Sequence, residues 1–144
     1  MIGPYLDTSA LAKWYLNEAF SAEFAAFMQQ QSAAAISRLT VVEFRCLLAR
    51  RRRAGDINRI IESRVSAVFE RDIGAGFLVM YPVADEHVAA AAEMISRLRR
   101  YPLRTLDALH LAIALAIRCR QLATADRVMA DAARASGLRV VRFS

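Results

Sequence analysis

The chain has 144 residues, 56% of them hydrophobic, with only five glycines and three prolines. This composition excludes a long disordered segment and predicts one domain over residues 1–144. Twenty basic residues against fourteen acidic ones give a net charge of +6, and every basic residue except Lys13 is an arginine. Such a charge favours a polyanionic partner, with a general arginine bias as the alternative explanation.

Hydrophobic periodicity predicts short strands alternating with helices from one end of the chain to the other. The expected strands cover residues 2–7, 33–36, 77–83, 122–124 and 138–143. The expected helices cover residues 9–16, 20–30, 40–53, 57–72, 85–100, 105–119 and 126–136. This alternation predicts an α/β fold, in which a central parallel sheet of four to five strands has helices on both faces.

The positions of the cysteines and the length of the longest apolar run indicate the cellular compartment in which the protein is expected. Cys46 and Cys119 each lie within an apolar helical run, which predicts buried thiols in a reducing environment. The N-terminus has no basic, cleavable leader, and the apolar run over residues 106–117 is too short to span a bilayer. We therefore expect a soluble, cytoplasmic protein without a membrane partner.

Four acidic residues follow strands or begin helices, where the carboxyl edge of a parallel sheet is expected. Asp7 ends the first expected strand and Asp126 follows the fourth. Glu43 and Asp107 fall in the first turns of helices expected to begin near Thr40 and Thr105. The sequence therefore predicts that all four carboxylates gather at one edge.

Each acid also has a purely structural explanation. Glu43 could complete a capping box with Thr40, and Asp7 could form an Asx-turn. Asp107 and Asp126 could complement a helix dipole, with Asp126 as an N-cap. Against these explanations, the helix that carries Asp107 is otherwise apolar except for His110. A buried carboxylate without a partner is unfavourable, and close carboxylates repel each other, so a cluster of four needs a cation.

The ligand types favour Mg²⁺, with Mn²⁺ as the alternative, because carboxylates are hard oxygen ligands. Zinc is disfavoured, since neither His87 nor His110 has a second His or Cys at ligand spacing. His110 is expected either to pair with Asp107 or to fill the core, and we favour a structural role.

A run of four arginines ends the helix that carries Glu43. The candidate RNA-binding residues are Arg45, Arg50, Arg51, Arg52 and Arg53. They predict a phosphate track that leads to the acidic site, with a solvated helix face as the alternative. Early aromatic residues fall at near-helical spacing and predict core packing or a homodimer face: Trp14, Tyr15, Phe20, Phe24 and Phe27.

Four segments resemble the motifs of one family in the correct order. Residues 5–11 (YLDTSAL) are similar to the opening of PIN-domain nucleases, in particular the VapC toxins of toxin–antitoxin pairs. Residues 39–44 (LTVVEF), 107–112 (DALHLA) and 122–126 (LATAD) resemble the later motifs of that family. The ordered set is specific, although no single motif is.

The resemblance implies a PIN-like three-layer α/β/α sandwich and an Mg²⁺- or Mn²⁺-dependent endoribonuclease. By position, Asp7 and Asp107 would be metal ligands, with Glu43 and Asp126 completing the catalytic site, and with Thr8 and Thr124 as polar neighbours. The family also implies cellular RNA, such as tRNA or rRNA, as substrate, a cognate antitoxin as partner, and a homodimer.

Two other phosphoryl-transfer classes fit poorly. A haloacid-dehalogenase-type enzyme needs an Asp two residues after Asp7, where this chain has Ser9, and a receiver-like domain needs a Lys near its last strand. The remaining alternative is a catalytically idle RNA- or partner-binding module on the same fold.

Overall fold

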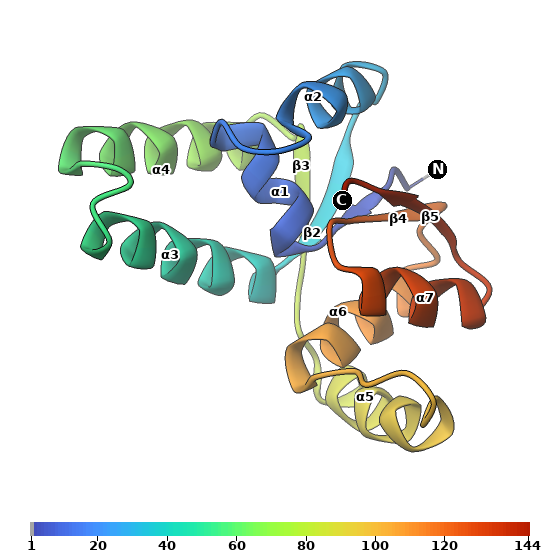
Figure 1. Ribbon diagram of the computed structural model, residues 1–144. Coiled ribbons are helices and arrows are strands. Elements are labelled where there is room, and N and C mark those ends of the chain that lie inside the picture. The colour runs from blue at the N-terminus through green and yellow to red at the C-terminus, as the bar shows by residue number, and fades with distance from the viewer. Residues whose placement is uncertain (1) are drawn as a thin grey trace.

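The structure, a computed structural model, describes residues 2–144 and contains a five-stranded parallel sheet between two helical layers (Figure 1). The strands are β1 (Tyr5–Leu6), β2 (Ala34–Ser37), β3 (Leu78–Tyr81), β4 (Gln121–Thr124) and β5 (Arg139–Arg142). The helices are α1 (Thr8–Tyr15), α2 (Ser21–Gln29), α3 (Arg38–Arg53), α4 (Arg59–Gly74), α5 (Asp85–Arg97), α6 (Thr105–Ala116) and α7 (Arg127–Ala135). The predicted three-layer α/β/α architecture is thereby confirmed.

The strand order is β3-β2-β1-β4-β5, and every neighbouring pair is parallel. The chain builds the sheet outward from β1 in one direction through β2 and β3, and then returns to add β4 and β5 on the other side of β1. The winding direction therefore reverses between β1 and β4. Ligands of open α/β sheets bind beyond the carboxyl ends of the strands at such a reversal.

Alternating side chains of the short strands pack into two separate hydrophobic cores, one on each face of the sheet. Leu6 and Ile36 pack on one side with helices α1, α2, α3 and α4. Tyr5 and Leu122 face the opposite side, where helices α5, α6 and α7 cover the sheet. Because successive strand residues point to opposite faces, an almost wholly apolar strand is buried on both sides.

One glycine allows β1 and β2 to lie close together. A Cβ atom on Gly3 would lie 2.1 Å from the carbonyl oxygen of Ala33, so a larger residue would force the two chain segments apart. Gly137, with φ of 89°, follows α7 in the left-handed conformation and allows the turn into β5.

The start of α3 differs from the prediction, and the difference removes one structural explanation for Glu43. The helix begins at Arg38 rather than near Thr40, with Ser37 as its N-cap and the Thr40 hydroxyl accepting from the Ser37 backbone N–H. Glu43 consequently lies in the second turn, beyond the reach of a capping box with Thr40.

The cysteine prediction was half wrong. Cys119 is buried, as expected, but Cys46 is exposed. On α3 the core positions belong to Phe44 and Leu48, and Cys46, two residues from each, points away from them.

The aromatic residues near the N-terminus differ in burial, since Phe24 is fully buried whereas Phe20 is exposed. Within residues 2–144, no helix has both the length and the apolar character needed to cross a bilayer.

Candidate active site

The four predicted acids line one cavity of 380 Å³ at the carboxyl edge of the sheet. They come from four different places in the fold: the end of β1, the second turn of α3, the first turn of α6, and the residue before α7. The cavity lies beside the β1–β4 reversal. Its full lining is Asp7, Thr8, Ser9, Glu43, Cys46, Leu47, Arg50, Arg104, Leu106, Asp107, His110 and Asp126.

Asp7 is the most deeply placed acid, with only 4% of its surface exposed. Its Oδ1 accepts hydrogen bonds from the Ala10 backbone N–H at 3.0 Å and the Ser9 hydroxyl at 2.7 Å, and its Oδ2 accepts from Thr124 at 2.5 Å. Burial raises the pKa of the Asp7 carboxyl above its ordinary value, although these hydrogen bonds oppose the rise. Asp7 is thus both the N-cap of α1 and a carboxylate held rigidly at the cavity wall.

Glu43 is held by partners from two other elements. Its Oε1 accepts a hydrogen bond of 2.8 Å from the Thr8 hydroxyl and is also hydrogen-bonded to Nε2 of His110. Partial burial raises its pKa, but the hydrogen bond and charge of His110, together with Thr8, outweigh burial and lower it overall. Glu43 is therefore a carboxylate kept in its ionised form.

Asp107 and Asp126 share one arginine. Arg104 Nε lies 3.5 Å from Oδ2 of Asp107, and Arg104 Nη2 lies 3.6 Å from Oδ2 of Asp126. Burial raises the pKa of Asp107, and the charges of Asp126 and Asp7 raise it further against the effect of Arg104. Asp126 also caps α7, because its Oδ1 accepts from the Met129 backbone N–H at 2.9 Å. The capping explanation of Asp126 is correct, and the residue nevertheless faces the cavity.

These residues suit a hard divalent cation. Among residues 2–144, no three His, Cys, Asp or Glu side chains already lie close enough together to coordinate one ion. The cavity nonetheless presents carboxylate oxygens from four acids, and the charges of Asp7 and Asp126 both raise the pKa of Asp107. A cation that interacts with Asp107 would relieve that repulsion, and the oxygen ligands are those that Mg²⁺ and Mn²⁺ prefer.

The predicted arginine track is only partly at the site. Arg50 lines the cavity, and its charge contributes to the lowered pKa of Glu43. Three of the others form ion pairs away from it, in the pairs Arg45–Glu70, Arg51–Glu18 and Arg52–Glu62. The arginine that contacts two of the acids, Arg104, was not predicted, because a single Arg before a helix gives no signal of its own in the sequence.

His110 was expected to pair with Asp107 or to fill the core, and it contacts Glu43 instead. The i to i+3 spacing suggested Asp107, but the helix turns His110 toward α3 and β1. Its burial matches the expected structural role, while its position on the cavity wall was not foreseen. Ser9, which donates to Asp7, was also missed.

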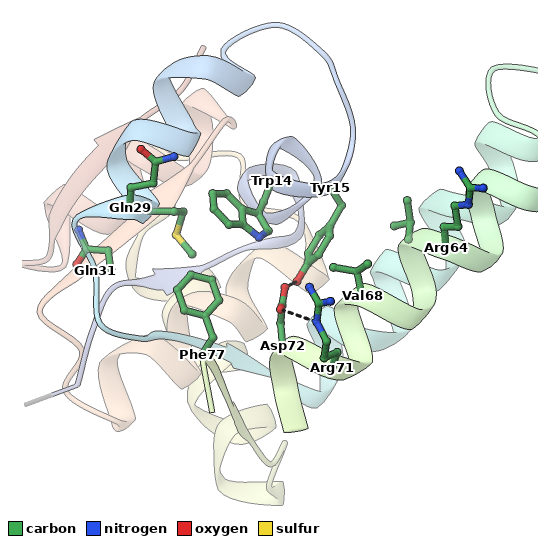
Figure 2. A pocket seen from close by; sticks show the side chains of 11 residues that line it. Trp14, Tyr15, Gln29, Gln31, Arg64, Val68, Arg71, Asp72 and Phe77 are labelled. Carbon is green, nitrogen blue, oxygen red and sulfur yellow. Dashed lines mark hydrogen bonds and ion pairs between the residues drawn. The ribbon is translucent and has the colours of Figure 1, made fainter. Parts of the chain in front are cut away.

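A larger cavity of 670 Å³ lies elsewhere, between α1, α2 and α4, and Figure 2 shows Trp14 and Phe77 facing it. Near these rings, the Tyr15 hydroxyl donates a hydrogen bond of 2.7 Å to Asp72. Trp14 and Tyr15 belong to the C-terminal end of α1, whereas Asp7 caps its N-terminal end. Its lining combines six apolar or aromatic side chains with Gln29, Gln31, Arg64, Arg71 and Asp72. Asp72 is the one acid among them, so this apolar groove has no carboxylate cluster.

Comparison with known proteins gives one family and a set of similar structures. The family model described as "PIN domain" matches residues 5–135. No curated protein matches the chain.

Three similar solved structures cover nearly the whole chain. The sarcin–ricin loop cleaving toxin VapC20 of Mycobacterium tuberculosis superposes with a TM-score of 0.76 at 17% identity, over 97% of this chain and 99% of that one. DNA-bound VapBC of Salmonella typhimurium gives 0.70 at 18% identity over 100% of both chains. FitAcB of Neisseria gonorrhoeae gives 0.69 at 17%, over 97% of this chain and 96% of that one. At these identities, the likeness concerns the fold.

Proposed function

Because this chain belongs to the PIN domain family, we propose that it is a metal-dependent endoribonuclease and the toxin of a toxin–antitoxin pair. One observation carries the proposal: four carboxylates from separate elements line a single cavity beside the β1–β4 reversal, and Asp7 and Asp126 both raise the pKa of Asp107. The proposed catalytic unit is one domain, residues 1–144.

Asp7 and Asp107 are the proposed metal ligands, with Glu43 and Asp126 completing the set directly or through water. Mg²⁺ is the proposed ion and Mn²⁺ its alternative. When bound, such an ion lowers the pKa of water, polarises the scissile phosphate and offsets the charge of the acids.

The surrounding residues hold these acids in place and bind the polyanion. Thr124 and Ser9 fix both oxygens of Asp7, so that this carboxylate cannot rotate. Arg50 and Arg104 lie on the cavity wall and supply positive charge for the phosphates that flank the scissile bond. Glu43 or Asp126 orients the attacking water or accepts its proton.

The antitoxin is the proposed protein partner, and the similarity to VapBC of Salmonella typhimurium named above supports it. Its proposed docking surface is the apolar groove that Trp14, Phe77 and Val68 line in Figure 2. An apolar groove can bind the apolar face of an amphipathic helix. A homodimer is also proposed from the family, and sedimentation analysis of the purified protein tests it.

One observation favours a second function, an idle RNA- or partner-binding module. Arg104 already neutralises Asp107 and Asp126 in part, and a binding module could retain that arrangement without turnover. Measuring RNA cleavage while Mg²⁺ is titrated separates the two functions, because a binding module without catalysis would show no Mg²⁺-dependent cleavage.

Expression in cells tests the proposed toxin function. Wild type and Asp7→Asn are induced separately, growth is followed, and new RNA 5′ ends are mapped. We expect growth arrest and a small set of new ends with wild type only. Equal toxicity and the same ends with both proteins would contradict a nuclease whose centre includes Asp7.

A further inference from the structure

A chain of buried polar groups leads from the sheet interior to Glu43. The Tyr5 hydroxyl donates a hydrogen bond of 2.9 Å to Ser37 Oγ and lies 2.7 Å from Nδ1 of His110. His110 Nε2 is in turn hydrogen-bonded to Oε1 of Glu43. The chain thus links β1, β2, α6 and α3 in one continuous path.

The path is closed to solvent until it reaches the cavity. Tyr5 and Ser37 are fully buried, and His110 is 2% exposed. The rings of Tyr5 and His110 also pack edge to face, with centroids 5.7 Å apart. Both ring nitrogens of His110 have hydrogen-bond partners, so the imidazole is held in one orientation. An exposed, freely rotating ring would not have a single orientation.

The two carboxylate oxygens of Glu43 differ in their hydrogen-bond partners. Oε1 has two partners, His110 Nε2 and the Thr8 hydroxyl. Oε2 has no hydrogen-bond partner among residues 2–144, and Glu43 lines the cavity. Two donors on one oxygen stop the carboxylate from rotating and leave a single defined oxygen for the chemistry of the cavity.

We propose that Tyr5, His110 and Thr8 are positioning residues that fix Glu43, so that its Oε2 is the oxygen presented to the reaction centre. This inference rests on the proposed function, because it assigns a task to Glu43 within the metal-dependent nuclease. His110, which the sequence suggested as a core residue, is thereby assigned a role in positioning Glu43. Partners that orient an acidic ligand in this way contribute about 10–100-fold to metal affinity or activity in metal sites.

Tyr5→Phe is the principal test, because it removes only the hydroxyl and keeps the ring that packs on His110. With the purified full chain and a structured RNA, we expect kcat to fall about 10–100-fold. We expect KM for RNA to stay within about twofold of wild type, since no contact with RNA is removed. His110→Gln keeps a donor near Glu43 but loses the contact with Tyr5, and should fall between wild type and His110→Leu.

His87→Gln is the matched control. His87 is the other histidine of the chain and is also buried, and its Nδ1 accepts from the Ala84 backbone N–H at 2.9 Å, but it does not line the cavity. Its loss should change thermal stability and leave kcat unchanged. A purely structural role for His110 would make the two glutamine variants behave alike.

A double-mutant cycle shows whether the effect passes through Glu43. In a Glu43→Gln background, Tyr5→Phe should cause no further fall in kcat. Independent, additive effects would overturn the positioning role. Calorimetric titration of Mn²⁺ without RNA gives a second readout, in which Tyr5→Phe and His110→Gln should bind the ion more weakly and His87→Gln should not.

The two proposals fail in different ways. A wild-type protein that neither binds Mn²⁺ nor cleaves RNA would contradict the proposed function itself. If wild type binds Mn²⁺ and cleaves RNA, and Tyr5→Phe and His110→Gln have the same Mn²⁺ affinity and kcat as wild type, only the positioning role would be overturned.

Discussion

The Thr124 hydroxyl donates a hydrogen bond of 2.5 Å to Oδ2 of Asp7, across 117 positions of sequence. The bond joins the ends of β4 and β1, the two strands on either side of the reversal in winding direction. It fixes an acid that burial alone would favour in its protonated form. The fold therefore buries an acid at a position where its ionisation is unfavourable for stability, as is common at functional sites.

Asp7→Asn should make the metal-free protein more stable near neutral pH. The amide has no charge to desolvate and can still accept from the Ala10 N–H. In EDTA we expect Tm to rise by about 3 °C, which corresponds to about 1 kcal/mol in a domain of this size. Differential scanning calorimetry measures the change, and a lower Tm for Asp7→Asn would show that the charge itself stabilises the fold.

The same substitution should change the pH dependence of stability. The pKa of Asp7 is higher in the folded than in the unfolded chain, so the folded state binds more protons. The stability contributed by protonated Asp7 is therefore present at low pH and is lost as the pH rises through the raised pKa. The Tm advantage of Asp7→Asn should be smallest below about pH 4, the ordinary range of an Asp carboxyl, and should grow as the pH rises above it, and a constant difference would contradict this titration.

Arg50 and Arg104, which line the cavity, should contribute more to RNA binding than the arginines of α3 that form ion pairs away from it. Each lines the cavity, and neutralising either should lower the slope of log affinity against log salt by about 0.7–0.9, the value of one phosphate contact. Filter binding of an uncleavable RNA at several salt concentrations gives the slopes.

Arg134→Gln is the control for charge in this experiment. Arg134 pairs with Asp131 on α7 and lies outside the cavity, yet its loss changes the net charge equally. Equal slopes for Arg134→Gln, Arg50→Gln and Arg104→Gln would indicate general electrostatics instead of a phosphate site.

The two cysteines should react at very different rates. Cys46 is exposed and lines the cavity, whereas Cys119 is buried and its pKa is raised to about 11 by that burial. A thiol reagent should modify one cysteine in the native protein and two in denaturant. A bulky adduct on Cys46 should also block RNA cleavage, and full activity after complete modification would place the RNA path elsewhere.

Trp14 should report antitoxin binding. It is the only tryptophan of the chain and lines the apolar groove of Figure 2. We expect its emission to shift to shorter wavelength when the cognate antitoxin binds, and Val68→Asp to weaken that binding at least tenfold while RNA cleavage is unchanged. Normal antitoxin binding by Val68→Asp would exclude this groove.

The sequence predicted the architecture well because short, mostly apolar strands alternate with longer helical patterns along the whole chain. It also predicted that Asp7, Glu43, Asp107 and Asp126 share one edge, since the carboxyl ends of parallel strands meet there. It failed where a contact depends on helix rotation. The start of α3 at Arg38 and the turn of His110 toward Glu43 follow from packing between elements far apart in sequence.

Asp7, Glu43, Asp107 and Asp126 are proposed to form a metal-dependent ribonuclease centre. The most direct measurement is the rate of RNA cleavage by purified protein against Mg²⁺ concentration, for wild type, Asp107→Asn and Asp131→Asn. Asp131 is an acid of α7 outside the cavity, so its variant controls for the loss of one charge. We predict saturable, EDTA-sensitive cleavage by wild type and Asp131→Asn, and a fall of at least a hundredfold for Asp107→Asn. Equal cleavage by all three proteins, or cleavage by wild type that persists in EDTA, would exclude a metal-dependent centre that includes Asp107.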